Sequence, residues 1–148
     1  MRTREIIDQM AELLLAGSET TSGTIACLFL ELARNPKVRA KLLASLPVQS
    51  FADDIVSSKT IRQEPQYEYL DACIKETLRL HPIASEMGRC TGDGWVSLMG
   101  YVLPPHTVVS ASYRHLHRNE EFWPQALRFW PERWLPEEKK GDEVPAPE

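Results

Sequence analysis

The feature that most constrains this chain is a helical pattern near its start, over residues 3–34. Apolar or small residues recur there every three or four positions, which places them on one face of a helix. Asn35-Pro36 ends the pattern, because the residue before a proline disfavours helical backbone. The sequence therefore predicts one long helix with a face buried against other elements. That face consists of Ile7, Met10, Leu14, Gly17, Thr21, Ile25, Leu28 and Leu32.

Residues 13–30 are apolar enough to raise the question of a membrane span, since Glu19 is the single charge among them. Residues 17–24 interrupt this stretch with no large apolar side chain. A spanning helix needs about 20 predominantly apolar residues. We therefore expect no membrane segment in this chain, and the first residues lack the apolar run of a signal peptide.

The composition is that of an ordinary globular domain, with 148 residues, 43% hydrophobic and 26% charged. The net charge of −4 argues against a nucleic-acid partner, which usually leaves a basic surface. The cysteines are Cys27, Cys73 and Cys90, an odd and scattered set that does not suggest a disulfide framework. A reducing compartment is the simpler interpretation.

Two further helices are expected, over residues 37–46 and 66–80, and His81-Pro82 closes the second. Residues 48–65 are polar and weakly patterned, which predicts a connector with a short helix near residues 51–56. The helical patterns thus occupy most of the first half of the chain.

The character of the sequence changes at residues 83–112, where four glycines separate short β-rich runs. These runs are residues 95–98, 101–103 and 107–111. Pro104-Pro105 marks a turn between the last two runs. The predicted fold class is mainly α with a small β-sheet. We expect one domain over residues 1–136 and a disordered charged, proline-containing tail over residues 137–148.

The pair Glu19-Thr20 is the most informative local feature, because a carboxylate among apolar turns is expensive to bury unless it is paired or useful. The Thr20 hydroxyl can bond back to the Ala16 carbonyl and bend the helix, and Gly17 has no side chain to fill the bend. This predicts a notch holding an acid and an alcohol. Two interpretations stay open: a proton relay, or close helix packing with Glu19 paired to an arginine elsewhere.

Glu76 and Arg79 are three residues apart and therefore meet on one helix face. Such a pair contributes only about 0–1 kcal/mol when exposed, but Arg133, in an aromatic and proline-rich run, is a candidate third member. An anchored surface loop would explain that run equally well. Arg89, before the first expected strand, could bind an anion or be merely solvated. The sequence has no recognisable metal-ligand spacing and no phosphate-binding loop.

Four segments, taken in order, resemble the cytochromes P-450, the heme-thiolate monooxygenases. Ala16-Gly-Ser-Glu-Thr-Thr21 resembles the oxygen-activation signature of that family's long central helix, and Lys75-Glu-Thr-Leu-Arg-Leu-His-Pro82 resembles its Glu-x-x-Arg helix. Gly100-Tyr-Val-Leu-Pro-Pro-His-Thr-Val108 is similar to the turn between the following strands, and Pro131-Glu-Arg-Trp134 to the arginine-bearing meander. Each motif is weak alone. Together they cover about residues 5–136 and imply a partial cytochrome P-450 fold.

The resemblance assigns roles to residues around a heme cofactor. Glu19 and Thr20 would be the catalytic pair that guides protons to iron-bound dioxygen. Ala16 and Gly17 would line the oxygen groove above the heme. Arg89 would pair with a heme propionate, which is a charge-assisted contact.

On the other side of the heme, Glu76, Arg79 and Arg133 would form a structural ion network by this resemblance. The parent protein would insert one oxygen atom into a small organic substrate, with electrons from a reductase. A eukaryotic member would be held at the endoplasmic reticulum membrane by an N-terminal anchor.

The chain departs from the family pattern at the iron ligand. The family's cysteine lies in a loop like Phe-x-x-Gly-x-Arg-x-Cys-x-Gly after the meander, and no cysteine follows Trp134 here. Gly88-Arg-Cys-Thr-Gly92 shares letters with that loop but precedes the meander and spaces its arginine differently. We therefore expect an internal fragment without a metal ligand, inactive alone. The alternative is a non-catalytic helical interaction module or a non-functional truncated product.

Overall fold

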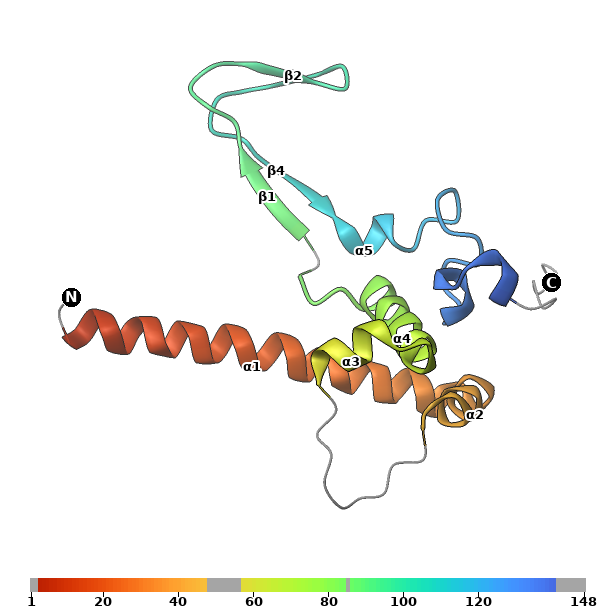
Figure 1. Cartoon of the computed structure of the whole chain (residues 1–148). Coiled ribbons are helices and arrows are strands. Elements are labelled where there is room, and N and C mark those ends of the chain that lie inside the picture. The colour runs from red at the N-terminus through yellow and green to blue at the C-terminus, as the bar shows by residue number, and fades with distance from the viewer. Residues whose placement is uncertain (1–2, 48–56, 85, 141–148) are drawn as a thin grey trace. The chain divides into compact units, whose positions relative to one another are not determined.

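The computed structural model describes residues 3–47, 57–84 and 86–140, and the chain divides into two compact units. The first unit comprises Met1–Ile83 with Leu127–Glu148 and is helical, whereas the second, Ala84–Ala126, contains the strands. Figure 1 shows the elements of each unit along the chain. The mainly α fold class with a small β component is thus confirmed.

The helices of the first unit match the sequence pattern closely at the long first helix, α1, which spans the residues expected. The helices expected at residues 37–46 and 66–80 are present as α2 and α4, the latter shortened by a preceding 3-10 turn. The bounds are α1 Thr3–Arg34, α2 Pro36–Ser45, α3 Ser58–Gln63, η1 Pro65–Tyr67, α4 Glu68–Leu80, η2 Pro131–Trp134 and η3 Glu137–Lys139.

Helix α3 lies in the segment that we expected to be a connector. It forms because Ser57 caps its start: the Ser57 Oγ accepts a hydrogen bond from the Thr60 backbone N–H at 3.1 Å. The short helix expected near residues 51–56 lies outside the described residues. The first residues of the expected tail form η3, residues 141–148 lie outside the described part, and the domain boundary at residue 136 stays a prediction.

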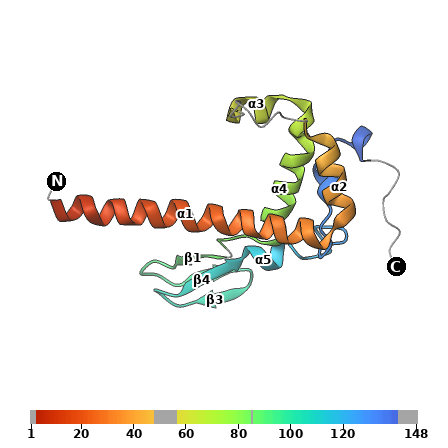
Figure 2. The ribbon, with the colours of Figure 1, turned by 90° about the horizontal axis from the view of Figure 1, so that it is seen from below.

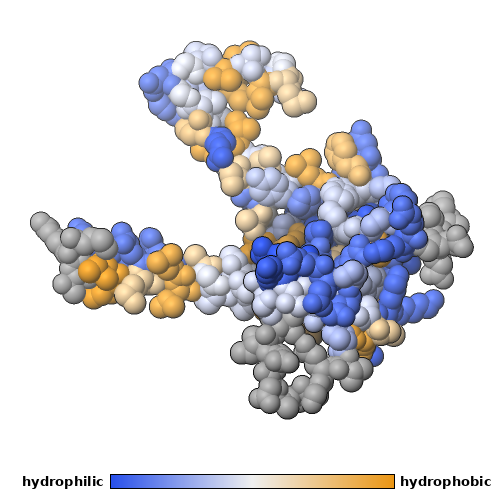
Figure 3. All heavy atoms as spheres, in the orientation of Figure 1, coloured by the Kyte–Doolittle hydropathy of each residue, from blue (hydrophilic) through white to orange (hydrophobic). Residues whose placement is uncertain are grey.

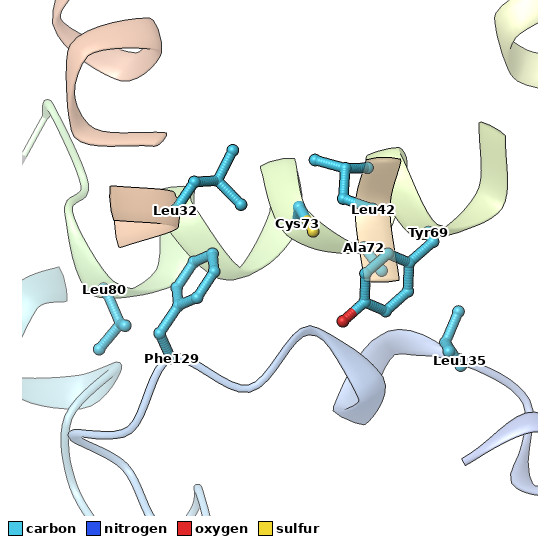
Figure 4. Packing of buried hydrophobic residues seen from close by; sticks show 8 residues of the cluster. All are labelled: Leu32, Leu42, Tyr69, Ala72, Cys73, Leu80, Phe129 and Leu135. Atoms are coloured by element: carbon cyan, nitrogen blue, oxygen red, sulfur yellow. The ribbon is translucent and has the colours of Figure 1, made fainter. Parts of the chain in front are cut away.

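The core of the first unit forms around α4, which packs against α1, α2 and η2 (Figure 4). Buried residues of α4 recur at helical spacing, so one face of this helix meets the end of α1, the middle of α2 and the segment around η2. The core cluster is Leu32, Leu42, Tyr69, Ala72, Cys73, Leu80, Phe129 and Leu135.

Most of the predicted buried face of α1 is exposed, and this expectation was wrong for the described chain. Ile7, Met10 and Leu14 are 60%, 57% and 71% exposed, whereas Leu32 is 8% exposed and belongs to the core. Figure 2 shows α1 running well beyond α2 and α4, and Figure 3 shows apolar side chains at its far end. Packing therefore reaches only the C-terminal turns of α1, because no described element of this unit packs against the rest.

By length and composition alone, Arg4–Arg34 could cross a membrane, although we expected no such segment. The core helix of a soluble protein passes the same test, so this property is weak support for a span. The absence of a membrane segment stays a prediction.

The second unit contains two antiparallel strand pairs instead of the single small sheet expected. Strand β1 (Glu86–Cys90) pairs with β4 (Val108–Ser112), and β2 (Val96–Leu98) pairs with β3 (Tyr101–Leu103). Three of these strands match the predicted runs within one residue at each end. Strand β1 was missed, and the helix α5 (Tyr113–Leu116) follows β4 directly.

Candidate functional site

Glu76 is the centre of a buried hydrogen-bond network in the first unit. Its side chain is 0% exposed. Arg79 binds it with two nitrogens, Nη2 to Oε1 at 2.8 Å and Nε to Oε2 at 3.0 Å. Arg133 donates from Nε to Oε1 at 3.0 Å. The Trp130 backbone N–H donates to Oε1 at 3.0 Å and the Trp134 indole to Oε2 at 2.9 Å.

The structure thus brings together the three residues predicted to form an ion network, and it adds two donors that sequence reasoning missed. Because Glu76 and Arg79 are one helical turn apart, α4 presents both to the same neighbour. The neighbour is η2, whose Pro131 begins a tight turn with Arg133 inside it. The run of aromatic residues and proline around Arg133 was the signal for this meander, but it did not reveal which atoms would donate.

In this network one carboxylate, Glu76, faces two guanidinium groups, Arg79 and Arg133. Burial alone would raise the pKa of Glu76, but the hydrogen bonds from Arg79 and Trp130 and the two arginine charges hold that pKa below its ordinary value. The Arg79 Nη2 also donates to the Arg128 carbonyl at 3.2 Å, and the Arg133 guanidinium lies 5.0 Å from the centre of the Trp130 ring. A carboxylate held in this way stays ionised at neutral pH. Glu76 is therefore suited to a structural role, joining α4 to the segment around η2, and not to proton transfer.

A second contact, which sequence reasoning missed, ties α1 to the end of α4. Glu31 is 8% exposed and its Oε1 lies 2.8 Å from Nε2 of His81, the residue that caps α4. Asn35 donates from Nδ2 to the Glu31 carbonyl at 2.8 Å. The partners are far apart in sequence, and no local spacing connects them.

The pair Glu19 and Thr20 lies in different surroundings. The Thr20 Oγ1 donates to the Ala16 carbonyl at 2.8 Å, as predicted. However, α1 is continuous through this turn, and Ala16, Gly17, Glu19 and Thr20 are all exposed. A Cβ added at Gly17 would meet nothing within 4 Å. The predicted notch is therefore not formed in the described structure, where no element of this unit packs over this turn. The predicted roles of these four residues stay predictions.

Arg89 lies on β1, and not in a loop before the first strand as expected. It is exposed, it is in register with Val109 of β4, and its Nη1 donates to the Gly88 carbonyl at 3.3 Å. Arg89 belongs to the second unit, whereas the Glu76 network belongs to the first. Its predicted role toward a propionate stays a prediction.

A sequence model described as "Cytochrome P450" matches residues 1–146. The chain belongs to the cytochrome P-450 family. Cyclooctat-9-en-7-ol 5-monooxygenase of Streptomyces melanosporofaciens is 36% identical over 138 residues, which are 92% of this chain and 28% of that protein. Cytochrome P-450 3A40 of Oryzias latipes is 37% identical over 138 residues, which are 91% of this chain and 26% of that protein.

The fold comparison agrees with the sequence match. A structure titled as zebra fish cytochrome P-450 with progesterone matches with a TM-score of 0.70 and 28% identity, covering 84% of this chain and 29% of that chain. The chain spans about a quarter of the length of most of these P-450 relatives. The resemblance drawn from four motifs is thereby confirmed, and heme iron is the cofactor that the family and its fold imply.

Of the three cysteines, Cys73 does not fit the part of an iron ligand. Cys73 is wholly buried in the core, and burial followed by the charge of Glu132 raises the pKa of its thiol to about 12. Cys27 is half-buried on α1 and Cys90 is exposed on β1. The described residues hold no group of three His, Cys, Asp or Glu side chains suited to a metal ion. That the chain lacks the family's thiolate ligand stays a prediction.

Proposed function

We propose that this chain is a portion of a heme-dependent monooxygenase, an oxidoreductase that inserts one atom of dioxygen into an organic substrate. The observation that carries the proposal is the Glu76 network, in which residues from two distant segments meet as the P-450 resemblance requires. Membership of the family, whose named relatives include monooxygenases, supports the same reaction class. The substrate, the reductase partner and any membrane location belong to the whole protein and are proposed with it.

Within that protein, Glu19 and Thr20 would hold and pass protons. The Thr20 hydroxyl donates a hydrogen bond to the Ala16 carbonyl, so the lone pairs of its oxygen can accept a hydrogen bond from an incoming donor. The adjacent carboxylate of Glu19 supplies the acceptor that a relay needs. Both groups are exposed here, so the pair requires a cover from other parts of the fold before it can act in a dry site.

The chain alone is proposed to be inactive, because none of its cysteines follows the meander, where the family's ligand loop places the iron ligand. The test is addition of heme to the 148-residue chain and to its Cys90→Ser variant, followed by reduction and addition of carbon monoxide. We expect no thiolate-type spectrum from either sample. A thiolate-type spectrum that disappears in Cys90→Ser would overturn the proposal and identify the ligand.

The family role of the segment can be tested in a host. A chimera is made in which this chain replaces the matching segment of the zebra fish protein, which shares its fold. We expect the chimera to take up heme, and Thr20→Ala in the chimera to lower the product formed per electron consumed. Equal coupling in the chimera and in its Thr20→Ala and Glu19→Gln variants would contradict the proton-relay role.

The alternative, a non-catalytic interaction module or non-functional truncated product, is favoured by the exposed apolar side chains of α1. Sedimentation at micromolar concentration distinguishes the two. Self-association that disappears when Leu14 is replaced by Glu would support the module. A monomer over the same range would argue against it.

A further inference from the structure

Two neighbouring side chains of η2, Glu132 and Arg133, contact different partners elsewhere in the first unit. Arg133 donates to Glu76, as described above, whereas Glu132 accepts hydrogen bonds from Tyr69 and Lys41. Consecutive side chains in a 3-10 helix point about 120° apart, because that helix has three residues per turn. One short turn therefore places its acid and its base on separate clusters.

The two clusters lie along the same helix. Tyr69 and Glu76 are both buried on α4, and a separation of two helical turns is about 10 Å along the axis. The segment around η2 thus follows α4 and is attached to it at two places. At Glu76 the segment is bound by the Arg133 side chain, the Trp130 backbone N–H and the Trp134 indole. Glu132 adds an attachment about two helical turns away, and two separated attachments restrict the orientation of the turn more than one does.

The contacts of Glu132 are close and involve a third element. Its Oε1 accepts from the Tyr69 hydroxyl at 2.8 Å and from the Lys41 Nζ of α2 at 2.8 Å. The same Lys41 Nζ lies 4.7 Å from the centre of the Tyr69 ring, within the range of a cation–π contact. The Glu132 side chain is 15% exposed, whereas Lys41 is half-exposed, so the bond from the buried Tyr69 is the better shielded from water of the two.

We propose that Glu132 is a positioning residue: its contacts with Lys41 and Tyr69 orient η2 so that Arg133 and Trp134 reach Glu76. A mobile Arg133 side chain would lose conformational entropy when it binds Glu76. If Glu132 already fixes the orientation of η2, less conformational freedom remains to be lost. The inference does not depend on heme binding, because every group in it belongs to the first unit of this chain.

Charge supports this arrangement. Burial would raise the pKa of Glu132, but the hydrogen bonds from Lys41 and Tyr69 and the lysine charge hold it below its ordinary value. Glu132 is therefore an anion at neutral pH and a strong acceptor. A surface Lys–Glu pair alone contributes little to stability. The hydrogen bond from the buried Tyr69 is therefore the contact that holds the Glu132 carboxylate in place.

The test uses the 148-residue chain and the indole N–H of Trp134, which donates to Glu76 and so reports whether η2 is in place. In Glu132→Gln and Tyr69→Phe we expect this proton to exchange with deuterated water at least tenfold faster, with the helical circular dichroism unchanged. Lys41→Met gives a smaller increase, and Lys41→Arg restores the slow exchange because it keeps the charge.

The matched control is Asp71→Asn, which removes an ion pair with Lys75 on the exposed side of the same helix. We expect no change in the Trp134 exchange there. Two results would overturn the inference: slow exchange retained in both Glu132→Gln and Lys41→Met, or an equal acceleration in Asp71→Asn. Should Glu132→Gln not fold, the pair Lys41→Met and Lys41→Arg decides alone, since Lys41 is half-exposed and its loss leaves the core intact.

Discussion

Two motifs of the first unit differ in burial: Glu19-Thr20 on α1 is exposed, whereas Glu76 and Arg79 on α4 are buried. On α4, Glu76 is wholly buried and receives donors from its own helix and from the η2 segment. On α1, Thr20 bonds only within its helix among the described contacts, and Glu19 beside it is exposed. Both motifs lie on helices that the sequence pattern predicted. The difference shows that the helix is encoded in its own residues, whereas a site also needs the neighbours that cover it.

The largest expected effect is that of Glu76→Ala. It leaves Arg79 and Arg133 without their carboxylate in a buried place, which is expected to cost about 3–5 kcal/mol of unfolding free energy. Urea unfolding of the 148-residue chain measures this loss. The matched variant on the other motif is Glu19→Ala, for which we expect an unchanged midpoint. Similar losses in both variants would remove the contrast between the two motifs.

A smaller effect separates the two ends of α1. Leu32→Ala opens a cavity in the core and is expected to destabilise the chain by about 2–3 kcal/mol, at the low end of such substitutions because Leu32 lies at the edge of the core. Leu14→Ala, on the exposed part of the same helix, is expected to have little effect. The comparison uses thermal unfolding of both variants. A large loss in Leu14→Ala would mean that this part of α1 is packed in solution.

The smallest expected effect is the pH dependence of the stabilisation by Glu132, the residue that attaches η2 to Tyr69 and Lys41. Because the folded pKa of Glu132 is lowered, its stabilisation is present at neutral pH and is lost as the pH falls through the folded value. The stability difference between the unchanged chain and Glu132→Gln should therefore be constant near pH 7 and shrink in acid. Urea unfolding at a series of pH values measures it. A difference that grows on acidification would contradict the lowered pKa.

The sequence predicted those features that depend on local pattern. The period of apolar residues located α1, and the spacing of Glu76 and Arg79 placed both on one helix face. The long-range contact with Arg133 was predicted only through the resemblance to the P-450 family, and the structure forms it. The exposed face of α1 was predicted as buried because periodicity shows which side of a helix is apolar without showing what covers it.

Other contacts between distant residues carry no family motif, and the sequence did not reveal them. Lys41 and Glu132 meet across 91 positions, and Glu31 and His81 across 50, with no motif linking either pair. Strand β1 was missed because its glycine, arginine and cysteine do not alternate as a half-buried strand does. Strand β1 forms through its antiparallel pairing with β4, which its own residues do not predict.

Hydrogen exchange of the backbone amides along α1 and α4 tests the contrast between the two helices most directly. Buried, packed helices open rarely, whereas a helix without tertiary contacts opens locally. In the 148-residue chain we expect amides of α4 and of the last turns of α1 to be strongly protected, and those over residues 6–22 to exchange at least a hundredfold faster. Equal protection along the whole of α1 would contradict the account, because it would require a partner surface on the face that the structure leaves open.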